Sequence, residues 1–237
     1  MPTLSQQYYR RNYTGEAITH VEDNELKSIV VTPREFPYDF NTRTAIVLGN
    51  GLGRTTPEVK LLLNQNNGRV AEGYKLTYAC NAAYRNTAAD YYILKNNVFF
   101  AEIPLQNYNK MFVPNDIWFS YRDANLLPYV YHMDAGASAA YLACFDGAKK
   151  VFLFGFDGTD GVTSDNTYAN TLGYDSPETI EDFNKFNMNL YMVMFRYSDV
   201  EFYRVRNQHS HDFYQSLKNL PNYHEVTVRD AVLLGDF

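Results

Sequence analysis

Two hydrophobic patterns alternate along this chain. Short apolar runs rich in β-branched and aromatic residues occur at 44–48 (TAIVL), 75–79 (KLTYA), 151–154 (VFLF) and 200–205 (VEFYRV). Runs of this length, bounded by glycine or polar residues, are typical of buried parallel strands. Residues 90–94 and 98–103 predict two further strands.

Helix signals lie between these runs. Thr56 is a suitable N-cap, Pro57 fits the first helical position and Gly68 ends the segment, with apolar residues at helical spacing in between. The small-residue segment 138–146 (SAAYLACFD), which stops at Gly147, predicts a second helix. A third is predicted from the cap, proline and acid at 176–178 to Met194.

Strands that alternate with helices predict an α/β fold of three layers, with a doubly wound, mostly parallel sheet of Rossmann-like type. We expect residues 1–16 to be a flexible N-terminal arm and residues 17–237 to form one domain. Residues 18–40, interrupted by Pro33 and Pro37, predict irregular structure. Pro114 and Pro128 exclude a long helix at 104–133, where we expect an irregular lid or a short antiparallel edge.

Composition and charge narrow the range of partners. The formal net charge of −6 leaves no broad basic surface for nucleic acid. The 21 tyrosines suit both half-buried strands and surfaces that face sugars or bases. Tyr8, Tyr9 and Tyr13 predict that the arm packs on a partner subunit of a homo-oligomer. The sequence has no apolar run long enough for a membrane span and no signal-peptide pattern, so we expect a cytoplasmic protein.

The candidate chemistry lies directly after the predicted strands, because ligands of open parallel sheets bind outside the carboxyl ends of the strands. Gly49, Asn50 and Gly51 follow the first strong strand. Glycines let backbone N–H groups approach an anion, and Asn50 adds a donor and an acceptor, so this turn suits a phosphate or a ribose. The other strand-end or helix-start positions are Asn81, Ser138, Gly155 and Asp157.

This turn does not match the common nucleotide fingerprints. The third glycine of G-x-G-x-x-G would stand where this chain has Arg54, and the P-loop pattern G-x-x-x-x-G-K-[ST] is absent. An NAD(P)-dependent oxidoreductase is therefore the weaker alternative. A tight turn with no ligand would also account for the glycines.

Three segments, IVLGNGLGR, YACNAAY and GASAAYLACFDGAKKVFLFGFD, carry a resemblance to known families. In their order and approximate spacing they resemble bacterial CMP-sialic-acid-dependent sialyltransferases and the related 6-hydroxymethylpterin diphosphokinase MptE-like (DUF115-type) proteins, discontinuously over residues 45–157. The resemblance implies that Gly49, Asn50 and Gly51 contact the phosphate and sugar of a nucleotide. It also places Asn81 near the ribose or base, Ser138 on the phosphate side, and Asp157 on the ribose or base.

Two departures from the family pattern bear on catalysis. Leu52 and Gly53 replace the P-S of the family turn, and residues 174–182, where the sialyltransferases carry a histidine base, contain no histidine. His209 and His211 follow the strand at 200–205 on its carboxyl side and are the candidate catalytic residues, together with Asp157. A polar H-x-H in a loop is also commonly just solvated.

The loop GFDGTDGVTSDN and its surroundings supply further candidates. Asp157 and Asp160 could hold Mg²⁺ for a diphosphate, or could be turn-forming residues only. A phenol at Tyr168 or Tyr174 could hydrogen-bond a leaving phosphate, as the resemblance implies. Arg54 could add charge to the same phosphate, or stand exposed at a helix start.

These features together predict a nucleotide- or nucleotide-sugar-dependent transferase, either glycosyltransferase-like or diphosphokinase-like. A non-catalytic ligand-binding or assembly protein on the same fold is the alternative, which the missing base and the altered turn favour.

Overall fold

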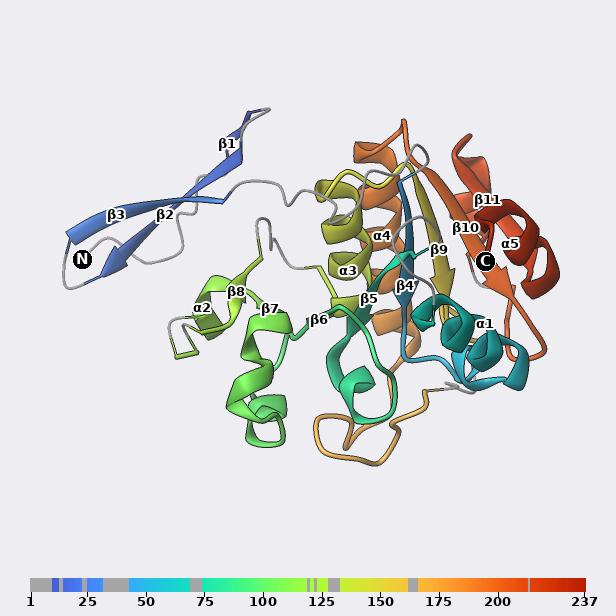
Figure 1. Ribbon diagram of the computed structural model, residues 1–237, viewed down its shortest axis with the longest axis horizontal. Helices are drawn as coiled ribbons and strands as arrows, with labels where there is room; N and C mark the ends of the chain where they lie inside the picture. The colour runs from blue at the N-terminus through green and yellow to red at the C-terminus, as the bar shows by residue number, and fades with distance from the viewer. Residues whose placement is uncertain are drawn as a thin grey trace.

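The computed structural model describes residues 10–12, 15–22, 25–31, 43–68, 74–118, 120–121, 123–127, 133–161, 166–212 and 214–237. Within these ranges the main body is an eight-stranded sheet whose neighbouring strands are all parallel, in the order β11-β10-β9-β4-β5-β6-β7-β8 (Figure 1). The strands are β4 (Thr44–Leu48), β5 (Leu76–Cys80), β6 (Tyr91–Ile93), β7 (Met111–Val113), β8 (Asn125–Leu126), β9 (Lys150–Phe154), β10 (Glu201–Arg206) and β11 (Tyr223–Thr227). The predicted doubly wound α/β fold is confirmed.

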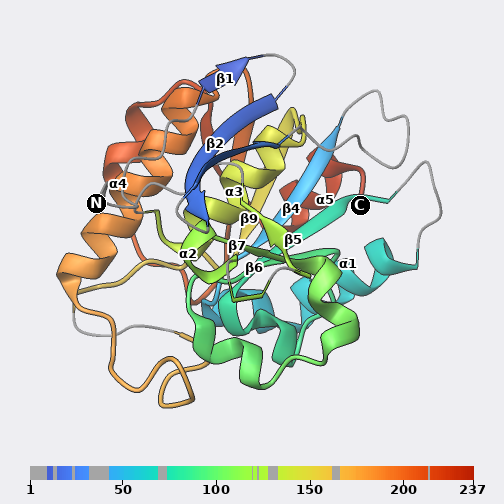
Figure 2. The same cartoon turned by 90° about the vertical axis from the view of Figure 1, so that its left-hand side faces the viewer.

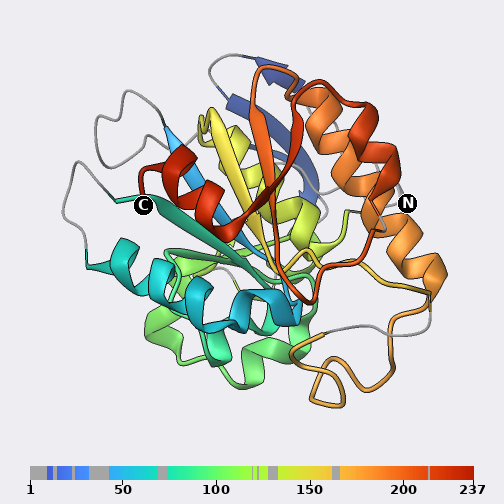
Figure 3. The ribbon, with the colours of Figure 1, turned by 90° about the vertical axis from the view of Figure 1, so that its right-hand side faces the viewer.

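Helices cover both faces of this sheet and complete the three layers (Figures 1 and 3). On one face lie α3 (Ala135–Phe145) and α4 (Ile180–Arg196), and on the other α1 (Pro57–Asn67) and α5 (Val228–Gly235). The central strands β4 and β5 are buried along their whole length, as hydrophobic strands are when helices cover both sides. The short helices are α2 (Asn115–Trp118), η1 (Leu52–Thr55), η3 (Asn81–Arg85), η4 (Asn97–Ala101), η5 (Leu105–Lys110) and η6 (Gln215–Asn219).

The strand order reverses between β4 and β9. From β4 the chain proceeds outward through β5, β6 and β7 to β8, and then returns through α3 to β9 on the other side of β4. The loops that follow the two strands diverge at such a switch point, which is where open α/β sheets bind their ligands. Gly49 to Gly51 follow β4 and Gly155 to Gly158 follow β9, so both predicted turns lie at this point.

Local sequence explains why the helices begin where they do. In α1, Thr56 is the N-cap, Pro57 is the first helical residue and Gly68 is the C-cap, as predicted. The predicted start of α4 at 176–178 is too early. Thr179 and Asp182 form a capping box, in which each side chain accepts a hydrogen bond from the backbone N–H of the other, and this fixes the helix start at Ile180.

Two predicted segments differ from the structure. The strand predicted at 98–103 is wrong, because Asn97–Ala101 form η4, whose N-cap Asn96 accepts a hydrogen bond from the N–H of Val98. Phe99 and Phe100 are buried in this helical turn, so their apolar character reports burial and not extended backbone. The described part of 104–133 does form an edge of the sheet, but β7 and β8 are parallel to their neighbours, not antiparallel.

The two ends of the chain contain elements that the sequence patterns do not predict. β1 (Arg10–Asn12), β2 (Gly15–Glu22) and β3 (Glu25–Val31) pair as a separate antiparallel sheet (Figure 2), so irregular structure is the wrong prediction for the described residues of 18–31. Tyr8, Tyr9 and Tyr13 lie outside the described residues. At the other end, β11 leads into α5, which starts with a capping box of Thr227 and Asp230. No helix in the described ranges has the length and apolar character to cross a membrane.

Candidate functional site

A cavity of about 340 Å³ lies at the carboxyl ends of the central strands. Its wall combines the turns after β4 and β9, the residues after β5 and β6, the start of α3 and the loop that leads to α4. The volume lies at the lower end of the range of small-molecule sites. Of the predicted site residues, the cavity brings together Gly49, Asn50, Gly51, Asn81, Gly155, Asp157 and Tyr174. No described residue between Pro104 and Leu127 lines it, so the described part of the segment predicted as a lid forms no part of its wall.

The glycines after β4 serve a close approach of two strand ends. The N–H of Gly49 donates to Phe154 O (2.8 Å), and the N–H of Gly51 donates to Gly155 O (2.9 Å). A Cβ at Gly49 would stand 2.5 Å from Gly155 O, which real structures do not show. We expected the N–H groups of Gly49 and Gly51 to face an anion, but they already donate to the end of β9 and to the turn that follows it.

Asn50 and Tyr174 form the polar centre of the wall. The amide of Asn50 donates to the Tyr174 hydroxyl, and the thiol of Cys80 donates to Asn50 Oδ1 (3.5 Å). Burial raises the pKa of Tyr174 well above its ordinary value and that of Cys80 to about 12, so both groups keep their protons at neutral pH. This pair supplies hydrogen-bond donors and acceptors but no charge.

Asn81 begins η3 with a φ of 43°, in the left-handed region that asparagine tolerates better than most residues. Its Oδ1 accepts a hydrogen bond from the backbone N–H of Lys95 (3.1 Å). Asn81 thereby ties the loop after β6 to the end of β5. That loop places Lys95 and Asn96 on the cavity wall.

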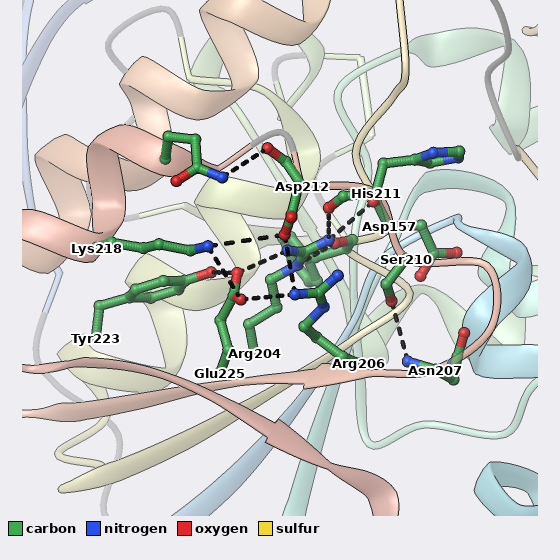
Figure 4. A network of polar contacts seen from close by, with 12 residues as sticks. Asp157, Arg204, Arg206, Asn207, Ser210, His211, Asp212, Lys218, Tyr223 and Glu225 are labelled. Atoms are coloured by element: carbon green, nitrogen blue, oxygen red, sulfur yellow. Dashed lines mark hydrogen bonds and ion pairs between the residues drawn. The ribbon is translucent and has the colours of Figure 1, made fainter.

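Asp157 is buried beneath the glycine turn. Its Oδ2 accepts a hydrogen bond from the N–H of Gly53 (2.6 Å), and its backbone oxygen accepts from the N–H of His211 (2.8 Å). The fully buried guanidinium of Arg204 donates to the backbone oxygens of Asp157 (2.8 Å) and Phe156 (2.8 Å) (Figure 4). Arg204 therefore fixes the β9 turn from below, and the position of Asp157 follows from it.

The start of α3 contributes backbone and one acid. Asp134 is the N-cap: its Oδ1 accepts from the N–H of Ala137 (2.9 Å), and its Oδ2 from the amide of Asn189 (3.1 Å). Burial raises the pKa of this carboxyl group, against the effect of these hydrogen bonds. Ser138 is fully buried and does not line the cavity, so the structure places it behind the wall.

The loop from Asn166 to Tyr174 closes one side of the cavity, at the carboxyl-end edge of the sheet (Figure 1). Asn166 bridges to Gly51, and the N–H of Thr167 donates to Asn50 O (2.8 Å). Arg85 fastens the outer end, since it donates to Thr171 Oγ1 (2.7 Å) and binds Glu102 through two nitrogens. This loop, and not the described part of residues 104–133, contributes to the cavity wall.

Arg54 is buried and anchors the same loop from inside. Its guanidinium donates to the Tyr168 hydroxyl, to Thr87 Oγ1 and to Asn86 Oδ1 (3.2 Å). Neither Arg54 nor Tyr168 lines the cavity. Both expectations for Arg54, a phosphate ligand or an exposed helix-start residue, differ from this buried position.

His209 and His211 also lie off the cavity wall. The backbone N–H of His209 donates to Asn207 Oδ1 (3.0 Å), and the backbone of His211 bonds to Asp157 and Arg204. The loop thus has an architectural function, because Asn207 in turn donates to Gly53 O (2.8 Å). Neither of the two side chains that we expected to act as a base lines this cavity.

The structure places the two carboxylates of the predicted Mg²⁺ site differently with respect to the cavity, and only Asp157 lines it. Asp160 is exposed and off the cavity wall, while Asp157 accepts the Gly53 N–H. Over the described residues, no three His, Cys, Asp or Glu side chains gather in a way that could hold a metal ion.

Lys95, Asn96, Asp134 and Glu178 also line the cavity and were not predicted. Lys95 and Asn96 directly follow the predicted strand 90–94, so the strand-end argument that selected Asn81 would also have selected them. Glu178 accepts a hydrogen bond from the amide of Asn166. The sequence marks Glu178 only as the acid of the predicted helix start at 176–178, not as a site residue.

The sheet topology and the strand-end cavity define a Rossmann-like α/β protein with a candidate ligand site at the switch point. The sequence matches no model of a known protein family and no curated protein. Among solved structures, it is similar to the monofunctional α-2,3-sialyltransferase Cst-I from Campylobacter jejuni, with 16% identity and a TM-score of 0.49 over 79% of this chain and 84% of that one. It is also similar to the Campylobacter jejuni sialyltransferase CstII in complex with a substrate analogue, cytidine-5'-monophosphate, with 13% identity and a TM-score of 0.43 over 68% of this chain and 79% of that one.

Proposed function

We propose that the protein binds a nucleotide or nucleotide-sugar in this cavity and acts as a transferase, with a glycosyltransferase-like reaction as its leading form. The observation that carries the proposal is the convergence of Asn50, Asn81 and Tyr174 on one cavity at the switch point of a parallel sheet. They come from three separate segments and supply the donors and acceptors that sugar hydroxyl groups and a phosphate require. The resemblance of the sequence motifs to CMP-sialic-acid-dependent enzymes supports the donor class.

In such a transfer the oxygen of an acceptor hydroxyl forms a bond to the sugar carbon and its proton passes to solvent. The bond between that carbon and the phosphate oxygen of the nucleotide breaks, and the phosphate leaves with the bonding electron pair. Tyr174 lies on the wall where its hydroxyl can donate a hydrogen bond to that oxygen. Because burial raises the pKa of this phenol, it acts as a donor and not as a base. Asn50 orients the hydroxyl through its amide.

A non-catalytic binding protein is the second candidate. The position of His209 and His211 outside the cavity wall favours it, because a general base must reach the proton that it removes. A diphosphokinase-like reaction has less support, since only one of its two candidate metal ligands, Asp157, lines the cavity.

Isothermal titration with CMP, CMP-sialic acid, GTP and ATP tests the binding proposal. At least one should bind with a Kd below about 1 mM, and Tyr174→Phe should weaken it about tenfold, which corresponds to one lost hydrogen bond. Tyr203→Phe is a matched control, because Tyr203 lies on β10, off the cavity wall. Folded protein that binds none of the four would refute the proposal.

Turnover separates the two candidates. Incubation with CMP-sialic acid and release of CMP, measured with a range of sugar acceptors, would support the transferase. Tight binding without release would support the non-catalytic protein.

A further inference from the structure

The charges on the cavity wall are unevenly arranged. Among the described residues that line it, Asp134, Asp157 and Glu178 are acids, and Lys95 carries the only positive charge. Each acid accepts a hydrogen bond from the protein itself: Asp134 from Ala137, Asp157 from Gly53 and Glu178 from Asn166. Their negative charge is thus partly offset by donors of the fold.

Lys95 is in a different position. Its backbone is fixed by Asn81, but its ammonium group makes no hydrogen bond or ion pair within the part of the chain that the structure describes. Burial lowers the pKa of this side chain to about 8, although the negative charges of Asp116 and Asp134 act in the opposite direction. A mostly buried cation of this kind is costly unless a counter-charge approaches it.

The glycine turn does not supply a competing anion site through its glycine N–H groups. The N–H groups of Gly49, Gly51 and Gly53 already donate to Phe154, Gly155 and Asp157. Asn50 and Tyr174 are neutral. Within the described wall, the charge of an anionic ligand is therefore left to Lys95 to balance.

We propose that Lys95 is the specificity-determining residue for an anionic group of the ligand, contacting it from the loop after β6 on the cavity wall. This inference rests on the proposed function, which makes the group either the nucleotide phosphate or a carboxylate on the transferred sugar. The shared chemistry is an oxyanion that accepts hydrogen bonds from an ammonium group. Neutral analogues that lack it should be rejected.

The test compares matched ligand pairs on four proteins: wild type, Lys95→Met, Lys95→Arg and Lys60→Met. Lys60 is an exposed lysine of α1, off the cavity wall, and controls for loss of a lysine as such. Isothermal titration is run with cytidine and CMP, guanosine and GTP, and adenosine and ATP for the phosphate, and with CMP-sialic acid and its carboxylate methyl ester for the carboxylate. Inorganic pyrophosphate is titrated separately as a probe without base or sugar.

Lys95→Met should reduce the preference for the anionic member of one pair at least tenfold, while Lys95→Arg and Lys60→Met keep it within about threefold. Loss in a nucleoside pair identifies the phosphate, and loss in the CMP-sialic acid pair identifies the carboxylate. The proposal would be overturned if Lys95→Met changed the affinity equally for both members of every pair, or if it changed no affinity at all. If no nucleotide binds the wild type, the proposed function fails. Pyrophosphate binding that Lys95→Met abolishes would then still support Lys95, and absence of pyrophosphate binding would overturn it too.

Discussion

The ammonium group of Lys95 titrates within an accessible pH range. Burial holds the pKa of this lysine at about 8 in the free protein, against the opposing charges of Asp116 on α2 and Asp134 before α3. A bound anion would favour the protonated form and raise this pKa. Because the anion binds the protonated form, affinity should be constant well below pH 8 and fall as the pH rises through 8, by up to about tenfold per pH unit.

Calorimetry with CMP or pyrophosphate between pH 6 and 10 measures this profile. Lys95→Arg should flatten it, because a guanidinium stays charged throughout. Lys95→Met keeps Asp157 and Glu178 on the wall, so any slope that it retains belongs to other groups. Stability gives a check without ligand. The folded pKa lies below the ordinary 10.5, so the unfolded chain binds more protons above pH 8, and wild type should gain stability relative to Lys95→Met as the pH rises toward 10.5.

The individual site residues show which roles sequence can predict. Strand-end position was sufficient to find Asn50, Asn81 and Asp157, since all three line the cavity. The buried position of Arg54 was not predicted, because its partner Tyr168 is 114 positions away and no local pattern signals their hydrogen bond. The burial of Arg54 depends on contacts between segments that are far apart in the sequence.

At the scale of elements, the loop from Asn166 to Tyr174 bears most on the cavity. Gly173 has a φ of 83°, and a Cβ there would stand 2.6 Å from the ring of Phe99. Gly173→Ala should therefore displace this loop from η4 and move Tyr174, with at least a tenfold loss of nucleotide affinity and a loss of stability of about 1–3 kcal/mol.

Gly161→Ala is the matched control. Gly161 also has a positive φ, of 90°, but a Cβ there meets no atom of the described residues within 4 Å. Gly161→Ala should lose only the smaller amount of stability that backbone strain costs, and it should keep the nucleotide affinity of the wild type. Thermal unfolding and calorimetry on both variants measure the difference. Equal losses in the two would mean that contact with Phe99 does not position the loop.

Elements differ in how well their sequence defines them. β4 is buried on every residue and flanked by glycine, and its predicted bounds are confirmed exactly. The segment VFFAEI predicts a strand, but its two aromatic rings are buried in the helical turn η4. Hydrophobicity alone does not distinguish a buried strand from a buried helical turn. β11 is mostly only half-buried, so its hydrophobic pattern is weaker than that of β4. The start of α5 is marked only by the capping box at Thr227.

At the scale of the whole molecule, the fold class follows from the alternation of strands and helices, but the strand order does not. The central place of β4 requires a pairing with β5 between Ala45 and Leu76, 31 positions apart, and a pairing with β9 between Thr44 and Lys150, 106 positions apart. The contact of Asn50 with Tyr174, 124 positions apart, depends on that order. Sequence therefore predicts which turns can bear a site, and the topology decides which of them meet.

Two arginines of β10 provide a test of how the sheet is held together. Arg204 is fully buried and binds Glu225 of β11 (2.9 Å) as well as three backbone oxygens (Figure 4). Arg206, two positions along, binds the same Glu225 (3.0 Å) but is partly exposed. Arg204→Met should lower the free energy of unfolding by about 3–5 kcal/mol, and Arg206→Met by less than about 1 kcal/mol.

Urea unfolding at pH 7 measures both, and its pH dependence tests the cause. Burial alone would raise the pKa of Glu225, but the Tyr223 hydrogen bond and Arg204 outweigh it and hold the pKa below the ordinary 4.5. The stabilisation is thus fully present above pH 4.5 and is lost as the pH falls through the lower folded value. The difference in the free energy of unfolding between wild type and Arg204→Met should become smaller in that acid range. A difference independent of pH would instead assign the effect to the backbone oxygens that Arg204 holds beneath the cavity.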